Sequence, residues 1–103
     1  APCDMRKGFD GLAAQVRNIL QLDPFSGAVF LFRGKRGNRL KALVWDGSGL
    51  CLYAKRLERQ KFVWPRASDG AVRLSGAQLA MLIEGLDWRH AIVHDEVVTP
   101  TLA

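Results

Sequence analysis

Three short apolar runs, separated by glycine-containing turns, limit what this chain can fold into. The runs occupy residues 28–32, 39–45 and 50–55, and their length and composition are typical of β-strands. Asp46-Gly47-Ser48-Gly49, between the second and third runs, is a hairpin sequence, because glycine accepts the positive φ that tight turns require. Since strands joined by such short loops pair antiparallel, the middle of the chain is predicted to form a meander sheet.

The length of each turn decides which side chains share a face of this sheet, because side chains alternate along a strand. A two- or four-residue loop at residues 46–49 and a four-residue loop at residues 34–37 predict four opposed pairs: Trp45 with Leu50, Leu43 with Leu52, Phe32 with Arg39, and Phe30 with Lys41. One face then holds Phe30, Phe32, Leu43, Trp45, Leu50 and Leu52, with Arg39 and Lys41 at one end. A three-residue loop at either turn would change this assignment.

Two amphipathic segments flank the predicted sheet. The first is predicted to begin at an Asp4 N-cap and to end at Asp23-Pro24, with one apolar face made of Phe9, Leu12, Ala13, Val16, Ile19 and Leu20. Trp45 is predicted to pack beneath this helix, against Phe9, Leu12 and Val16. Ser75 is predicted to cap a second helix whose apolar side holds Leu79, Leu82, Ile83 and Leu86, with Gly85 near its end.

Two further strands are predicted at residues 62–64 and 71–74, whereas residues 91–103 form an added strand, a docking segment or a mobile tail. Without a repeat or linker, the chain is predicted to be one domain over residues 1–103. The predicted fold class is α+β, with an antiparallel meander sheet of about four to five short strands packed with two helices.

Composition sets further limits. A chain of 103 residues that is 49% apolar can build one core without a disulfide or a metal. No apolar run approaches the roughly 20 residues of a membrane-spanning helix, and no secretion signal opens the chain, so a cytoplasmic protein that does not contact a membrane is expected. Cys3 and Cys51 fit reduced cytosolic thiols, with a bridge between them as the alternative.

Positive charge is concentrated in the middle third of the chain. Residues 33–66 carry ten basic and two acidic side chains, whereas residues 1–32 are balanced and residues 67–103 are net negative. Such a block is typical of contact with a polyanion, most often nucleic acid, and its alternative is a solvated surface that discourages strand edges from pairing. The candidate nucleic-acid-binding residues are Arg33, Lys35, Arg36, Arg39, Lys41, Lys55, Arg56, Arg59 and Lys61.

Other motifs favour a structural interpretation. Gly34-Lys35-Arg36-Gly37 lacks the spacing and the ending of a phosphate-binding Walker loop, although as a basic hairpin tip it can still bind a phosphate backbone; the alternative is an exposed turn whose charges discourage strand edges from pairing. Trp64, between Val63 and Pro65, is predicted to belong to the core rather than to a base-stacking surface. His90 and His94 have no third metal ligand of suitable spacing, and the carboxylates are too scattered for an acid–base pair. The sequence therefore predicts a protein that is not an enzyme and uses no metal or other cofactor.

Several motifs, in order and with matching gaps over residues 4–89, carry a specific family resemblance. They are Asp4-Met5-Arg6-Lys7-Gly8-Phe9-Asp10-Gly11-Leu12, Asp23-Pro24-Phe25-Ser26-Gly27, Phe30-Leu31-Phe32-Arg33-Gly34, Trp45-Asp46-Gly47-Ser48-Gly49-Leu50-Cys51-Leu52, Lys55-Arg56-Leu57-Glu58, Phe62-Val63-Trp64-Pro65 and Gln78-Leu79-Ala80-Met81-Leu82-Ile83-Glu84-Gly85-Leu86-Asp87-Trp88-Arg89. The chain resembles the accessory protein, often called TnpB, that is the second open reading frame of bacterial insertion sequences of the IS-sixty-six type. Family members tend to carry a short strand-like stretch before the first motif, where this chain has only residues 1–3, so a truncated N-terminus is one interpretation.

The resemblance implies a role in transposition beside a separate transposase, and it assigns no binding residues. Together with the charge block it predicts a non-enzymatic accessory protein that binds DNA through the basic hairpin. The alternative is a module that docks the transposase or another protein of the same element without contacting DNA. Apolar residues on both faces of one strand, Leu40, Ala42 and Val44 against Leu43 and Trp45, favour that alternative or a homodimer.

Overall fold

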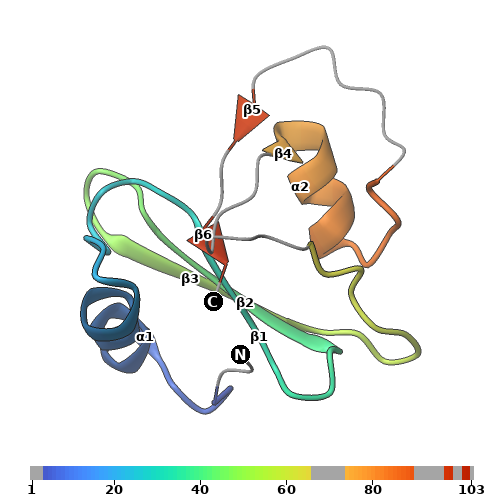
Figure 1. The fold of residues 1–103 in the computed structure, drawn as a ribbon, viewed down its shortest axis with the longest axis horizontal. Helices are drawn as coiled ribbons and strands as arrows, with labels where there is room; N and C mark the ends of the chain where they lie inside the picture. Colours follow the sequence, from blue (N-terminus) through green and yellow to red (C-terminus); the bar gives the residue numbers. More distant parts are fainter. Residues whose placement is uncertain (1–3, 66–73, 90–96, 99–100, 103) are drawn as a thin grey trace.

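A four-stranded sheet forms the centre of the computed structural model, which describes residues 4–65, 74–89, 97–98 and 101–102 (Figure 1). Strands β1 (Phe30–Arg33), β2 (Arg39–Trp45) and β3 (Leu50–Arg56) form the predicted antiparallel meander. The strand order is β3-β2-β1-β6, because β6 (Thr101–Leu102) pairs in parallel with the free side of β1. The fourth strand of the sheet thus comes from near the C-terminus.

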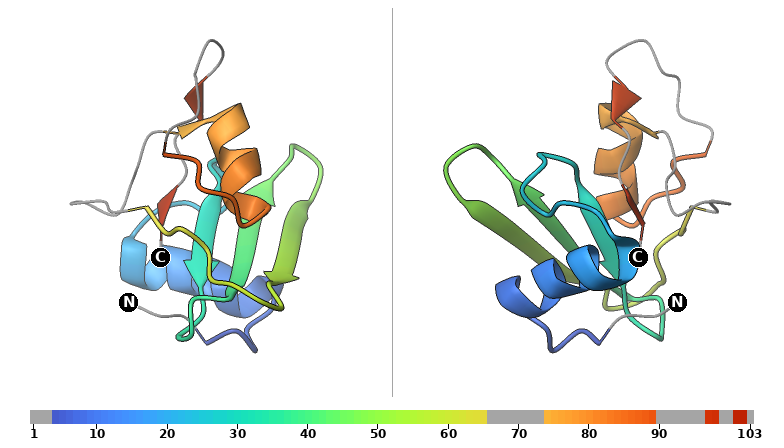
Figure 2. Two further views of the ribbon diagram at one scale, coloured as in Figure 1. Left: turned by 90° about the vertical axis from the view of Figure 1, so that its right-hand side faces the viewer. Right: turned by 60° about the vertical axis from the view of Figure 1, so that its left-hand side comes forward.

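Helices cover both faces of this sheet (Figure 2). Helix α1 (Phe9–Gln15) continues as a π-helical stretch, η1 (Val16–Leu20), and packs on one face. Helix α2 (Gly76–Ile83) packs on the other face and follows β4 (Leu74–Ser75), which pairs antiparallel with β5 (Val97–Val98). The layers are α1, sheet and α2 in one compact domain, so the predicted α+β class is confirmed.

The core beneath α1 is made by alternate side chains of the meander. Its buried residues are Leu12, Ala13, Val16, Phe30, Phe32 and Leu43, with Leu50 and Leu52 packed against them. This is the predicted apolar face except for Trp45, which is half-buried and packs edge-on against Phe25, with ring centroids 5.4 Å apart. Phe9 is 49% exposed, so the predicted packing of Trp45 with Phe9 beneath the helix is wrong. Phe25, from the loop after the helix, takes that place.

The second core lies between the sheet and α2. Its buried residues are Leu31, Leu40, Ala42, Leu57, Phe62, Leu74 and Leu82. Leu40 and Ala42 therefore bury their side chains within the domain, and Leu43 does so on the opposite face. Because both faces of β2 are covered internally, its apolar residues no longer argue for a protein partner.

The two hairpins differ in how well their registers were predicted. In the second, Trp45 pairs with Leu50 and Leu43 with Leu52, as predicted. In the first, the predicted pairs of Phe32 with Arg39 and Phe30 with Lys41 are wrong: the structure pairs Phe32 with Lys41 and Phe30 with Leu43. The Gly34 N–H donates to the Arg39 carbonyl oxygen at 3.0 Å, which moves the four-residue loop to residues 35–38. This two-residue shift leaves every side chain on its predicted face.

Helix α1 begins later than predicted. Gly8 stands at the N-cap and Asp4 does not cap the helix, because the Asp4 carboxylate accepts hydrogen bonds from the backbone N–H and the guanidinium of Arg6, each at 3.0 Å. The second helix is capped as predicted. Ser75 Oγ accepts from the Gln78 N–H at 3.0 Å, and Gln78 Oε1 accepts from the Ser75 N–H at 3.0 Å, so both side chains form a capping box.

The strand predicted at residues 62–64 is absent. The Phe62 N–H donates to the Gly37 carbonyl oxygen at 2.9 Å, and the Val63 carbonyl oxygen accepts from Trp88 Nε1 at 2.6 Å. These backbone groups are satisfied by a loop and a side chain instead of a neighbouring strand. The strand predicted at residues 71–74 lies outside the described residues except for Leu74, which opens β4. Within residues 91–103 the described pieces are the strands β5 and β6.

Candidate nucleic-acid interface

Two basic stretches that are distant in sequence meet at one end of the sheet. The Leu57 N–H donates to the Asn38 carbonyl oxygen at 2.8 Å, and the Phe62 N–H donates to the Gly37 carbonyl oxygen at 2.9 Å. These bonds hold the loop after β3 against the turn between β1 and β2. All nine candidate cations lie on these two loops or on the strand ends that enter them. We call this region the basic end of the sheet.

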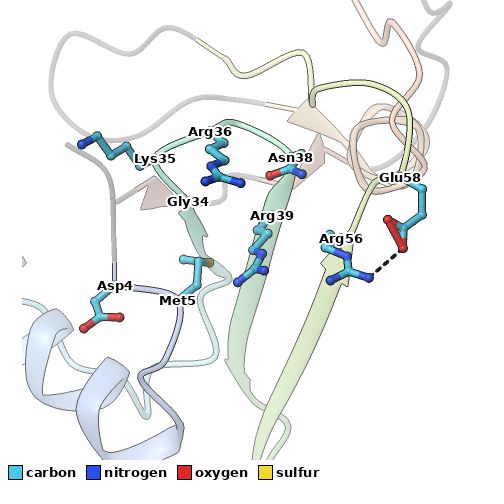
Figure 3. Close-up of a pocket in the computed structure, with 9 residues that line it drawn as sticks. All are labelled: Asp4, Met5, Gly34, Lys35, Arg36, Asn38, Arg39, Arg56 and Glu58. Carbon is cyan, nitrogen blue, oxygen red and sulfur yellow. Dashed lines mark hydrogen bonds and ion pairs between the residues drawn. The ribbon is translucent and has the colours of Figure 1, made fainter.

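An open cleft of about 740 Å³ lies at the basic end (Figure 3). Four of the nine candidates line it: Lys35 and Arg36 from the turn, Arg39 from the start of β2, and Arg56 from the end of β3. A neighbouring cleft of about 440 Å³ shares Arg39 and Arg56 and adds Lys41 and Lys55. The two clefts give the basic end a hollowed surface, whose walls carry cations from the turn, from β2 and from β3.

Arg39 and Arg56 are direct cross-strand neighbours in the β2–β3 register, and both side chains are exposed. The Arg56 guanidinium forms an ion pair with Glu58 at 2.8 Å, and this hydrogen bond raises the pKa of Arg56. Within the part of the chain that the structure describes, the Arg39 guanidinium has neither a hydrogen bond nor an ion pair. Like charges directly opposite each other destabilise a sheet, so the pair is electrostatically unfavourable.

Besides Arg56, three of the nine candidates are engaged in contacts within the domain. Lys41 Nζ donates to the Lys7 carbonyl oxygen at 2.7 Å, which ties β2 to the segment before α1. Lys55, whose side chain is 25% exposed, pairs with Glu84 at 3.5 Å. The Arg33 guanidinium carbon lies 6.0 Å from the centroid of the Trp64 ring. Trp64 is partly buried and packs against the core beneath α2, as predicted.

The remaining candidates, Arg59 and Lys61, are exposed on the loop after β3. The aliphatic part of Lys61 lies against Gly37: a Cβ added at Gly37 would stand 3.5 Å from Lys61 Cδ. The Lys61 ammonium and the Arg59 guanidinium can therefore stay in water while the aliphatic stem of Lys61 covers the turn. The structure brings all nine cations to one end of the sheet, but only six of them line the two clefts.

Sequence reasoning missed four residues that line the larger cleft: Asp4, Met5, Asn38 and Glu58. Arg6 lowers the pKa of Asp4 from 3.8 to about 2 through side-chain and backbone hydrogen bonds, so this carboxylate stays charged at the border of the cleft. Met5 packs so close to Gly34 that a Cβ there would stand 3.0 Å from Met5 Cγ. The position of Glu58, inside the charge block and two residues after Arg56, could have indicated that it lies near the candidate cations. Asp4 and Met5 could not be predicted from the sequence, because only the fold brings the N-terminal segment to the cleft.

The structure also describes some of the other groups that could carry chemistry. No group of three or more His, Cys, Asp or Glu side chains lies together in the described residues, and His90 and His94 fall outside them. Cys51 is an exposed free thiol whose Sγ donates to Asp46 at 3.4 Å; this hydrogen bond raises the pKa of Cys51. A helix long and apolar enough to cross a bilayer is not found in the segments described.

Comparison with known proteins identifies a protein family that this chain matches. Residues 1–92 match the model of a protein family described as IS66 Orf2 like protein. Two relatives from Sinorhizobium fredii (strain NBRC 101917 / NGR234) are similar to the chain, and both are described as uncharacterized proteins. One, y4hO, is 52% identical over 87 residues, which are 84% of this chain and 76% of the relative. The other, y4jC, is 46% identical over 87 residues, 84% of this chain and 74% of the relative. No solved structure matches the chain.

Proposed function

We propose a molecular role that starts from one premise: this chain belongs to the IS66 Orf2-like family of transposition accessory proteins. In this role the protein binds the DNA of the insertion sequence through the basic end of its sheet and acts there beside the transposase. It performs no catalytic step itself. Its place of action is the bacterial cytoplasm, where the element's DNA lies.

One observation carries this proposal: the fold gathers two basic stretches, which are 14 or more residues apart in the sequence, onto one hollowed surface. Lys35 and Arg36 are exposed there and have no ion pair within the described residues. A cation without a carboxylate partner can bind a phosphate without first breaking an ion pair. Phosphate contacts supply most of the affinity of non-specific DNA binding. The Lys35–Asn38 turn projects from the sheet, which allows it to follow a duplex backbone.

The experiment is a binding titration of the purified chain with a fluorescent duplex of random sequence and with its single strands, in rising salt. Phosphate contacts predict a dissociation constant that rises steeply and linearly on logarithmic axes, because bound phosphates release counterions. Absence of binding to either DNA at low salt would contradict the proposal. It would favour a partner protein as the ligand of the basic end.

A second candidate function, docking of the transposase, is favoured by exposed apolar side chains after α1. Ile19 is 69% exposed, and Leu22 and Phe25 are each 45% exposed. Ile19 lies in η1, and Leu22 and Phe25 lie on the segment that leads from η1 to β1. A pull-down of the transposase from cells that carry the whole element, with and without nuclease treatment, separates direct docking from a DNA bridge. Loss of capture by Ile19→Ser with DNA binding intact would support a docking role of its own.

A further inference from the structure

Arg39 and Arg56 lie directly opposite each other on neighbouring strands, although like charges at such positions destabilise a sheet. In the β2–β3 register they are directly opposed, so their Cα atoms are about 4.5–5.5 Å apart and both side chains leave the same face. Figure 3 shows the two side chains next to each other on adjacent strands, with Glu58 reaching only Arg56. Of these two adjacent guanidinium groups, Arg56 alone is paired with a carboxylate among the described residues.

We propose that Arg39 and Arg56 form a clamp for a single phosphoryl group, with Glu58 as the resident anion that this phosphoryl group displaces from Arg56. The inference rests on the proposed function and deepens it: the clamp is the point at which one backbone phosphate of DNA is held. Guanidinium groups bind phosphate oxygens through pairs of parallel hydrogen bonds, and two of them on one rigid sheet can do so from both sides.

Three features of the site fit a phosphoryl group. The clamp lies where the two clefts meet, because Arg39, Arg56 and Glu58 line both of them. Its two arginines stand on strands, and the adjoining loop is held by the hydrogen bond from the Leu57 N–H to the Asn38 carbonyl oxygen at 2.8 Å. Glu58 is 70% exposed, so its carboxylate can move into water when another anion arrives. A backbone phosphodiester carries one negative charge, as the Glu58 carboxylate does, but its two free oxygens can each accept hydrogen bonds from one of the two guanidinium groups.

The test is a titration with inorganic phosphate, observed through the side-chain Nε–Hε nuclear magnetic resonance signals of arginine at constant ionic strength. The signals of Arg39 and Arg56 are expected to move together along one saturating curve. The signal of Arg59, an exposed arginine outside both clefts, serves as the internal control and should follow only the weak non-specific drift. Shifts of Arg39 and Arg56 no larger than that of Arg59 would overturn the clamp.

Variants make the same test quantitative. Arg39→Gln and Arg56→Gln should each weaken phosphate binding by about tenfold or more, as expected for lost charge-assisted hydrogen bonds, whereas Arg17→Gln, at an exposed arginine outside the basic end, should leave it nearly unchanged. Arg39→Lys should not restore binding, because lysine lacks the planar fork. Glu58→Gln should tighten phosphate binding several-fold by removing the competing anion. Unchanged or weaker binding by Glu58→Gln would contradict the displacement of Glu58.

Duplex DNA separates this inference from the proposed function on which it rests. Arg39→Gln and Arg56→Gln are expected to lower duplex affinity more than Arg59→Gln does, although each variant removes one charge. Duplex binding that falls equally in all three variants would overturn the clamp and leave the DNA-binding function standing. Phosphate binding at Arg39 and Arg56 without any duplex binding would overturn the DNA-binding function and leave the clamp as a site for a smaller phosphorylated ligand.

Discussion

Gln60 Nε2 donates a hydrogen bond to the carbonyl oxygen of Gly85 at 2.8 Å, across 25 residues of sequence. The bond joins the loop after β3, which is part of the basic end, to the residue that follows the C-terminal turn of α2. The ion pair of Lys55 with Glu84 at 3.5 Å lies beside it. Helix α2 therefore does more than cover a face of the sheet, because its C-terminal end supports the loop that carries Arg59 and Lys61.

Gly85→Ala is expected to destabilise the protein. Gly85 has φ +78°, and a Cβ there would stand 2.8 Å from Gln60 Nε2 and 2.9 Å from Leu57 Cδ1. The left-handed backbone alone costs a residue with a Cβ roughly 1–2 kcal/mol, and the crowding adds to that, so a loss of about 2–4 kcal/mol in the free energy of unfolding is expected. Urea denaturation measures this loss.

Gly76→Ala is the matched control for that change. Gly76 is the first residue of α2, and a Cβ there would meet nothing within 4 Å. Alanine at such a position restricts the unfolded chain without straining the folded one, so stability should be unchanged or higher by up to about 1 kcal/mol. Equal losses in the two variants would show that the contacts around Gly85 are not what the substitution disturbs.

Removing the two side chains of the α2 capping box is expected to lower the free energy of unfolding in a way that is not additive. Ser75→Ala removes the acceptor for the Gln78 N–H and should cost about 1 kcal/mol, within the roughly 0.5–2 kcal/mol that N-cap losses show. Gln78→Ala removes the reciprocal bond to the Ser75 N–H at 3.0 Å. Because each side chain helps to position the other, the double variant should lose less than the sum of the single losses. Additive losses in a double-mutant cycle would contradict this coupling.

Asp46 predicts an acid-dependent part of the stability. The Ser48 and Gly49 N–H groups donate to its carboxylate and lower its pKa from 3.8 to about 2. A lowered pKa in the folded state means that the charged carboxylate favours folding. The stabilisation is complete at pH values above the ordinary pKa of 3.8. It is lost as the pH falls through the folded-state pKa of about 2.

Wild-type protein should therefore lose stability more steeply than Asp46→Asn between about pH 5 and pH 2. Urea denaturation at several pH values compares the two slopes, and the carboxyl carbon signal of Asp46 reports its titration directly. A titration midpoint at the ordinary value of 3.8 would be incompatible with the turn geometry described for residues 46–49.

Local chemistry was sufficient to predict the second hairpin but not the first. At residues 46–49 both the two-residue and the four-residue loop predict the pairing of Trp45 with Leu50, which the structure shows, whereas a three-residue loop would have changed it. At residues 34–37 the turn has a glycine at each end, and sequence alone does not decide whether Gly34 belongs to the strand. Its N–H bonds to the Arg39 carbonyl oxygen, so the loop begins one residue later.

Contacts that depend on distant segments could not be predicted. The fourth strand of the sheet is β6, a two-residue pairing with β1 across about two-thirds of the chain, which no local periodicity reveals. For the candidate site, the meeting of the two basic stretches followed from the hairpin geometry. The partners that distinguish one cation from another, such as the Lys7 carbonyl oxygen for Lys41 and Glu84 for Lys55, are set by tertiary packing.

The salt dependence of duplex binding tests the central claim, that the basic end holds DNA by charge. The variant Lys35→Gln/Arg36→Gln removes two exposed cations of the larger cleft. Its control, Arg17→Gln/Arg89→Gln, removes two exposed arginines from outside the basic end. Each lost phosphate contact reduces the slope of log affinity against log salt concentration by about 0.9, so the first variant should flatten the slope by up to about 1.8 and the control should leave it unchanged. Equal slopes for the two variants would contradict the claim.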